Sequence, residues 1–434
     1  MKTIHISNKA NRKKAKESQC EIGEKSKMTY QNEKIIIYGA GKNCTILLEN
    51  AIFINATILG VVDKYRCGEY INDYKIMDLD YIVDSDFDKI LITPVDNEDI
   101  VKNLESEYGI KKERMILPED INSRLILEGV KEHRIVLISR QPKYTYFYFV
   151  FKKLIEENKV SNIRLLQCKH KISFDRVVQK KVLFLYMSFD ILHLKDRCLL
   201  ESLKKAVPNA ESMLWLCDPC DDVQYDIPKI FDAYGNYDGL KKSFNYCYTY
   251  HLKDSERYGF VYYPLFYPRI NINKYYCEEL YDVFFIGEAK HRYSLIKSIY
   301  QHLSRNGVRC HFFVGKAPDD DRIDGIHYIS RYMNYEDTLR EMNKCRCILD
   351  VCECGDETSQ RYAEAVTFGK KLLVNDVGVE KKEYYNSRNI YVYDSADNID
   401  IEWVYIDKMD YGYNGNLDTE YFLKNTVPWL NAFL

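Results

Sequence analysis

The sequence predicts an α/β protein with three parallel-sheet domains arranged in series. The 434 residues exceed what one hydrophobic core usually serves. Short apolar runs alternate with helical patterns along most of the chain, which implies parallel sheets wound with right-handed crossovers. Two of these blocks open with an apolar run that ends in glycine, "KIIIYGAG" and "YDVFFIG". We therefore expect a tail over residues 1–30 and domains over residues 31–128, 129–270 and 271–434.

The composition is that of an ordinary globular protein, with 46% hydrophobic and 29% charged residues. The formal net charge of -3 leaves no basic surplus to displace counterions from a nucleic acid, so we expect no nucleic-acid partner. Fourteen cysteines without a signal segment favour reduced thiols in a cytoplasm. No run approaches the ~20 apolar residues of a membrane span. Residues 1–30 start basic and lack periodicity, so we expect a disordered, solvated tail, with contact to anionic lipid as the alternative.

The first domain carries part of a nucleotide-binding pattern. Gly39 and Gly41 match the first two glycines of a dinucleotide-binding turn, and Asp63 closes the second strand, where a ribose-binding acid would sit. Cys44 occupies the third glycine position, and its side chain should push the helix away from the strand. The domain resembles the small Rossmann-like domains placed ahead of sugar-modifying and methyl-transferring enzymes in bacterial polysaccharide clusters. A weak nucleotide site and a structural role both remain open.

The second and third domains together describe an enzyme with a cleft. The second opens with "RIVLIS" and the third with "YDVFFIG", and they join near Pro268. Two α/β domains of similar size are expected to hold a ligand between their sheets. The last helix, "DTEYFLKNTVPWLNAFL", has an apolar face at helical spacing, so we expect it to cross back onto the second domain.

The stretch "GDETSQRYAEAVTFG" has the features of a ligand-binding helix start. It follows the apolar strand "CILDVC", whose carboxyl end is where open α/β sheets bind ligands. Thr358 or Ser359 can cap the helix and leave N–H groups and a positive dipole end suited to a diphosphate. Glu364 would lie about 7.5 Å along the helix, where an exposed carboxylate can accept from both hydroxyls of a ribose. Asp356 stands eight positions before Glu364, and Gly369 should end the helix.

The residues "ETSQRYAEAVTFGKKLLVND", after "HYISRYMNYEDTLREMNKCRCILDV", resemble the C-terminal domain of GT-B glycosyltransferases. These sugar transferases have two Rossmann domains and a signature of two acids eight apart. Within them, the chain is similar to bacterial capsule and lipopolysaccharide transferases, in which an Arg precedes the second acid by three, as Arg361 precedes Glu364. "NYCYTYHLKDSERYGFVYYPLFY" and "MLWLCDP" are similar to the same group's N-terminal domain. The first acid is Asp356, and Glu357 stands one step out of register.

The resemblance implies further donor contacts in the third domain. Ser330 and Arg331 fall where the family's base-contacting loop lies, although a surface Arg fits equally. Gly287 ends the first strand, and Lys290 or Arg292 would face the donor phosphates. The implied donor-binding set is Gly287, Lys290, Arg292, Ser330, Arg331, Glu357, Thr358, Ser359, Arg361 and Glu364.

Two acids are the catalytic candidates. Asp218 ends the strand "MLWLCD" on the acceptor side and is the candidate general base, or else caps the following turn. Asp356 would meet the transferred sugar. The alternative for the helix in "GDETSQRYAEAVTFG" is that Arg361 and Glu364 only pair with one another on a solvated face.

We therefore predict a cytoplasmic GT-B glycosyltransferase that moves a sugar from a nucleotide diphosphate-sugar to a bacterial cell-surface glycan or lipid-linked acceptor. Peripheral contact with the inner face of the membrane is a further expectation. The resemblance implies that no cofactor and no metal are needed, because in GT-B sites the helix dipole and basic residues stabilise the leaving diphosphate. One alternative is a non-catalytic nucleotide-sugar-binding module. The other is an enzyme that uses a nicotinamide or methyl-donor cofactor at Gly39, Gly41 and Asp63.

Overall fold

The computed structural model describes most of the chain in two compact units. The described residues are 32–49, 56–139, 146–187, 197–217, 219–220, 234–331, 333–352 and 359–434. Those up to Arg124, together with Leu166–Lys169, form the first unit, and the remainder forms the second. The described residues contain three six-stranded sheets, with parallel pairing throughout apart from one short hairpin. The predicted α/β class with Rossmann-like parallel sheets is confirmed.

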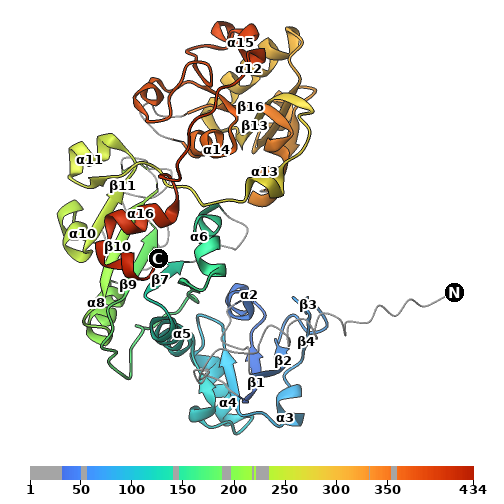
Figure 1. The fold of residues 1–434 in the computed structure, drawn as a ribbon. Coiled ribbons are helices and arrows are strands. Elements are labelled where there is room, and N and C mark those ends of the chain that lie inside the picture. Colours follow the sequence, from blue (N-terminus) through green and yellow to red (C-terminus); the bar gives the residue numbers. More distant parts are fainter. Residues whose placement is uncertain are drawn as a thin grey trace, which may run out of the picture. The chain divides into compact units, whose positions relative to one another are not determined.

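The first unit holds one sheet in the order β3-β4-β2-β1-β5-β6. Figure 1 labels its strands β1 to β4. The side chains of Ile36, Val62, Ile90 and Ile92 form its core, because strands covered on both faces are apolar along their length. Its strands are β1 (Lys34–Tyr38), β2 (Thr57–Val62), β3 (Tyr70–Ile71), β4 (Tyr74–Met77), β5 (Lys89–Ile92) and β6 (Met115–Ile116). Its helices include α2 (Lys42–Glu49), α3 (Tyr81–Asp84) and α4 (Glu98–Ser106), and α5 (Pro118–Glu132) leads into the second unit.

The second sheet runs β12-β11-β10-β9-β7-β8, all parallel. The sequences of β7 and β9, IVLIS and LFLYM, are buried at every residue. The strands are β7 (Ile135–Ser139), β8 (Val160–Arg164), β9 (Leu183–Met187), β10 (Glu211–Leu216), β11 (Tyr246–Thr249) and β12 (Val261–Tyr262). The helices described with them include α6 (Tyr146–Glu156), α8 (Arg197–Ala206), α10 (Tyr237–Ser243) and α11 (Leu252–Tyr258).

The third sheet has the order β15-β14-β13-β16-β17-β18. Numbered within this sheet, that is the doubly wound order 3-2-1-4-5-6, whose direction of winding reverses between β13 and β16. The strands are β13 (Tyr281–Glu288), β14 (Cys310–Gly315), β15 (His327–Ile329), β16 (Cys345–Asp350), β17 (Lys371–Val374) and β18 (Ile390–Val392). The helices are α12 (Tyr293–Arg305), α13 (Tyr335–Asn343), α14 (Gln360–Phe368) and α15 (Ile401–Tyr405).

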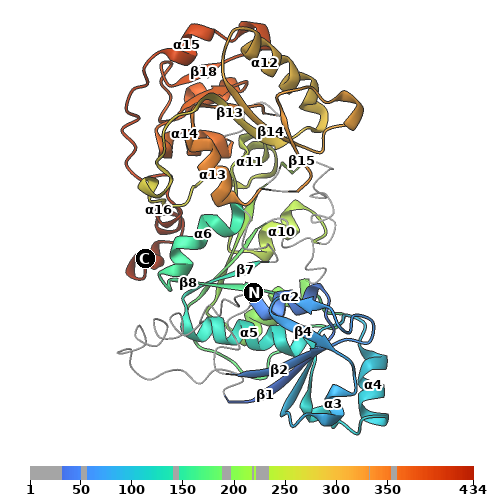
Figure 2. The ribbon, with the colours of Figure 1, turned by 90° about the vertical axis from the view of Figure 1, so that its right-hand side faces the viewer.

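The helices of the third sheet are divided between its faces (Figure 2). Val283 and Phe285 of β13 point to the face covered by α12 and α15, whereas Phe284 points to the face covered by α13 and α14. This alternation follows from the two-residue period of a strand. The face with α13 and α14 is the one on which the candidate site is built.

The end of the chain packs against the second sheet. Helix α16 (Thr419–Thr426) places the Phe422 ring in a stack on Phe266, with centroids 4.2 Å apart, and edge-on to Trp215 at 5.2 Å. Just before α16, Asp418 forms an isolated parallel bridge with Tyr267. Within the described ranges, no helix combines the length and apolar character needed to cross a membrane.

Candidate functional site

The candidate site lies at the carboxyl ends of β13 and β16, where ligands bind in open α/β sheets. The two strands are paired neighbours, so Glu288 and Asp350 end at the same edge. Gly287 leaves the room that this edge needs, because an added Cβ would lie 3.0 Å from a guanidinium nitrogen of Arg292 and 3.0 Å from the Phe285 ring. A larger residue at position 287 would therefore require the Arg292 guanidinium and the Phe285 ring to shift by a few tenths of an ångström.

Helix α14 begins beside this edge. The hydroxyl of Ser359 accepts from the Arg361 N–H at 3.1 Å, so Ser359, one of the two caps that the sequence allows, is the N-cap. The same hydroxyl hydrogen-bonds the carboxylate of Asp350, which is buried at the end of β16. Burial raises the pKa of Asp350, and Ser359 and Arg361 oppose that shift. Gly369 ends the helix with a left-handed φ of 59°, also as predicted.

Glu364 is completely buried, which corrects the expectation of an exposed carboxylate. It has 0% exposure. Its Oε1 accepts from the Tyr335 hydroxyl at 2.5 Å and from Gln360 Nε2 at 2.7 Å. Its Oε2 accepts from Arg361 at 2.5 Å. The pairing with Arg361 that the sequence offered as an alternative is therefore present, but it lies in the interior and not on a solvated face.

Two arginines donate to backbone carbonyls at the end of β13. Arg361 reaches the Ile286 carbonyl at 3.2 Å, and Arg292 reaches that of Glu288 at 3.2 Å and that of Val351 beyond β16. Burial by itself lowers the pKa of Arg361, but the charge and hydrogen bond of Glu364 raise it, and the net shift is upward. Arg361 thus stays cationic, and the hydrogen bonds hold both side chains at the sheet edge.

The other predicted donor residues are more dispersed. Lys290 lies in a short 3-10 helix next to Arg292 and has a φ of 43°, which is uncommon for a residue with a side chain. Ser330 and Arg331 follow β15 and are exposed. Since β15 is two strands from β13 in a parallel sheet, they lie along the same carboxyl edge and not beside Arg361. The remaining predicted residues, Asp218, Asp356, Glu357 and Thr358, lie outside the described residues.

Sequence reasoning missed three side chains of the site. Asp350 had a signal, since it is an acid at the carboxyl end of an apolar strand. Tyr335 and Gln360, the neutral partners of Glu364, had none, because their hydrogen bonds depend on how the helices pack.

In the first unit, backbone N–H groups of the protein itself bind the carboxylate that the sequence predicts for a nucleotide. The Asp63 carboxylate accepts from the N–H groups of Ala40 at 2.8 Å, Tyr65 at 2.9 Å and Arg66 at 3.2 Å. Gly39 has a φ of 92°, and a Cβ there would lie 2.7 Å from the Pro94 ring. The Asp63 carboxylate, which would bind a ribose in a nucleotide site, is therefore already hydrogen-bonded to the backbone.

The two other residues of that pattern differ in their surroundings. A Cβ at Gly41 would meet no atom within 4 Å, so packing does not require glycine there. Cys44 is buried in α2, and burial raises the pKa of its thiol to about 12. A neutral, inert thiol at this position behaves as a small core residue.

The comparisons with known proteins include a family model and a solved structure. Residues 31–116 match the family described as C2185-like, N-terminal. The crystal structure of Anabaena Alr3699/HepE in complex with UDP and glucose is similar with a TM-score of 0.45 and 10% identity, over 69% of this chain and 100% of that one. Among curated protein sequences, none matches this chain.

Proposed function

We propose that the third sheet binds a nucleotide diphosphate-sugar at the ends of β13 and β16, and that the protein transfers the sugar. The observation that supports this most is the meeting of Arg292, Arg361 and the N-terminus of α14 at the reversal point of the sheet. Guanidinium groups and the first N–H groups of a helix are the usual protein partners of a diphosphate. The positive dipole end of α14 adds to their field.

The proposed chemistry needs charge stabilisation more than covalent catalysis. When the sugar leaves, negative charge grows on the diphosphate, and fixed cations stabilise that charge without rearranging. This proposal therefore requires no metal and no cofactor. Asp218 is proposed as the general base and Asp356 as the acid beside the sugar. The proposed acceptor is a bacterial cell-surface glycan or a lipid-linked precursor, reached in the cytoplasm or at the inner face of the membrane.

Glu364 has a specific place in this proposal. In the described conformation both of its oxygens accept from protein groups, so its direct effect is to orient Arg361. Because Glu364 is fully buried, contact with a ribose, as the family resemblance implies, requires the side chains around it to move.

A thermal-shift screen with UDP, GDP, CDP, ADP and dTDP and their sugar conjugates tests the proposal. A ligand at 100 times its dissociation constant adds about 2.7 kcal/mol of stability. We expect one nucleotide to stabilise the wild type, and Arg292→Gln to weaken that effect. The control is Arg322→Gln, which changes an exposed arginine in the connection between β14 and β15 that pairs with Asp319 at 2.7 Å.

The screen has two unfavourable outcomes. No stabilisation by any of these nucleotides would reject the donor site. Binding without hydrolysis or transfer in the presence of candidate acceptors would instead favour a non-catalytic nucleotide-sugar-binding module.

A further inference from the structure

A chain of buried hydrogen bonds runs from the connection between the second and third sheets to Arg361. The hydroxyls of Tyr267 and Tyr335 are 2.7 Å apart, and the Tyr335 hydroxyl donates to Glu364 at 2.5 Å. Glu364 in turn holds Arg361, which donates to the Ile286 carbonyl. Tyr267 and Glu364 have 0% exposure and Tyr335 has 6%, so water does not compete along this path.

The direction of the hydrogen bonds follows from their chemistry. The Tyr335 hydroxyl donates its single O–H to the Glu364 carboxylate. The Tyr335 oxygen can then only accept from Tyr267. Along this path, the Tyr267 hydroxyl therefore donates to Tyr335, and the Tyr335 hydroxyl donates to Glu364.

Tyr267 lies where the chain passes between the two sheets in both directions. The chain leaves the second sheet through Tyr267 and Pro268, and it returns at residues 417–419. The Tyr267 N–H donates to the Leu417 carbonyl at 2.6 Å, and its carbonyl accepts from the Thr419 N–H at 3.0 Å. The Thr419 hydroxyl also donates to Val150 of α6 at 2.9 Å. Both crossings are therefore fastened to each other at Tyr267.

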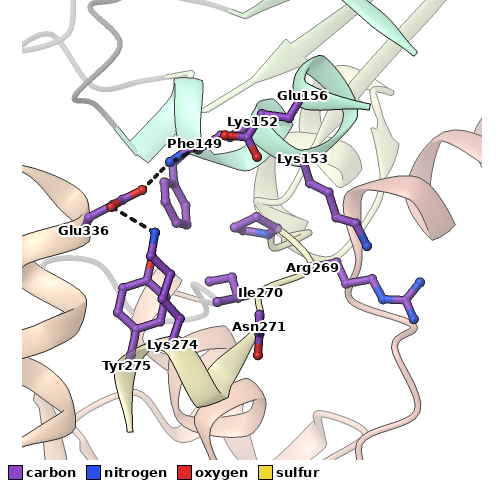
Figure 3. A pocket seen from close by; sticks show the side chains of 11 residues that line it. Phe149, Lys152, Lys153, Glu156, Arg269, Ile270, Asn271, Lys274, Tyr275 and Glu336 are labelled. Atoms are coloured by element: carbon purple, nitrogen blue, oxygen red, sulfur yellow. Dashed lines mark hydrogen bonds and ion pairs between the residues drawn. The ribbon is translucent and has the colours of Figure 1, made fainter. Parts of the chain in front are cut away.

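The first turn of α13 is fastened to the same connection by a second route. The Tyr335 ring packs edge-on against Phe149 of α6, with centroids 4.9 Å apart. Glu336 pairs with Lys152 of α6 and, at 3.2 Å, with Lys274 of the connection, beside a pocket of about 380 Å³ (Figure 3). A movement of α6 relative to the third sheet would therefore pull on α13 and on Tyr335.

We infer that Tyr335 is a positioning residue that couples the connection between the two sheets to the orientation of Arg361. A change in the angle between the sheets would alter the Tyr267–Tyr335 contact, and Glu364 would transmit that change to the guanidinium. The role of this coupling in donor binding rests on the proposed function. The coupling itself is a property of the folded chain and is testable without any nucleotide.

A double-mutant cycle tests the coupling alone. Tyr267 and Arg361 share no contact, so Tyr267→Phe and Arg361→Lys should act independently on unfolding unless Tyr335 and Glu364 link them. We expect the unfolding constant of the double variant, measured in urea, to differ by roughly threefold or more from the product of the single effects. If Arg361→Lys does not fold, Gln360→Ala takes its place, since Gln360 also bonds Glu364.

The matched control is Tyr246→Phe, which removes a phenol that donates to Glu211 at 2.8 Å in the second sheet. Combined with Arg361→Lys, it should give the product of the single effects within about twofold. If Tyr267→Phe and Arg361→Lys also gave the product of their single effects, as the control pair should, the coupling would be overturned.

A binding measurement then tests the consequence for the donor site. The probe is whichever of UDP, GDP, CDP, ADP and dTDP binds the wild type most tightly, measured by calorimetry. We expect Tyr335→Phe to reduce its affinity by roughly 5- to 10-fold, while Tyr246→Phe leaves it unchanged. Unchanged affinity in Tyr335→Phe would reject its positioning role. If no nucleotide binds the wild type, the proposed function fails, and the double-mutant cycle still decides the coupling.

Discussion

Arg361 and Glu364 form a buried ion pair across one turn of α14, with the Arg361 side chain 18% exposed and that of Glu364 0% exposed. Removing either partner of such a pair leaves a charge in a low-dielectric surrounding, and that costs far more than an exposed pair contributes. The helix that the sequence marked as a ligand contact is thus also part of the core.

Glu364→Gln tests the consequence for stability. An amide presents one oxygen where two charged oxygens accept from Tyr335, Gln360 and Arg361. We expect the free energy of unfolding to fall by about 2–3 kcal/mol, below the 3–5 kcal/mol of a fully buried pair because Arg361 keeps some exposure. Urea denaturation measures this, with the exposed Glu402→Gln of α15 as the control expected within ~0.5 kcal/mol. Equal stability of wild type and Glu364→Gln would contradict the buried pair.

Asp350→Asn tests the burial of the acid at the end of β16. Burial raises the folded-state pKa of Asp350 above that of the unfolded chain. The folded state then binds this proton more tightly than the unfolded chain, so the stability that Asp350 contributes is fully present below about pH 4 and is lost as pH rises through the raised pKa. Asparagine removes this loss, and we expect Asp350→Asn to be more stable than wild type at pH 8 but not at pH 4. Urea midpoints across that range measure it, and a difference that does not change with pH would refute the assignment.

Asp63→Asn tests whether that acid serves the turn or a ligand. Three backbone N–H groups donate to its carboxylate, so we expect a loss of about 1–2 kcal/mol in unfolding free energy. The exposed Asp73→Asn is the control and should be nearly silent. Calorimetry on the wild-type protein should show weak or no NAD binding. Micromolar NAD affinity that Asp63→Asn abolishes would favour a nicotinamide enzyme.

Asp218→Asn tests the proposed catalytic base. Asparagine keeps the size of the side chain but not its basicity, so donor affinity should persist while sugar transfer falls by roughly 100-fold or more. Turnover with the donor identified in the thermal-shift screen measures this, beside calorimetry of the same donor. Full turnover in the variant would remove Asp218 from the mechanism and favour a retaining reaction without a protein base.

The three-sheet α/β architecture and the ends of α14 were predictable from the sequence, because they depend on local patterns. The alternation of apolar runs and helical segments predicts the parallel sheets. The Ser359 cap and the Gly369 terminus follow from the conformational and hydrogen-bonding preferences of single residues, so they can be predicted from one turn of sequence.

Only the tertiary structure decided what Glu364 contacts. A polar residue in the middle of a short helix reads as exposed unless its partners are known, and one partner, Tyr335, is 29 positions away. Arg361 is held by a carbonyl 75 positions away, on another strand. The free-energy cost of burying a charge depends on whether hydrogen-bonding partners surround it. For Glu364 those partners are brought together by the packing of α13 and α14 on β13, not by the neighbouring sequence.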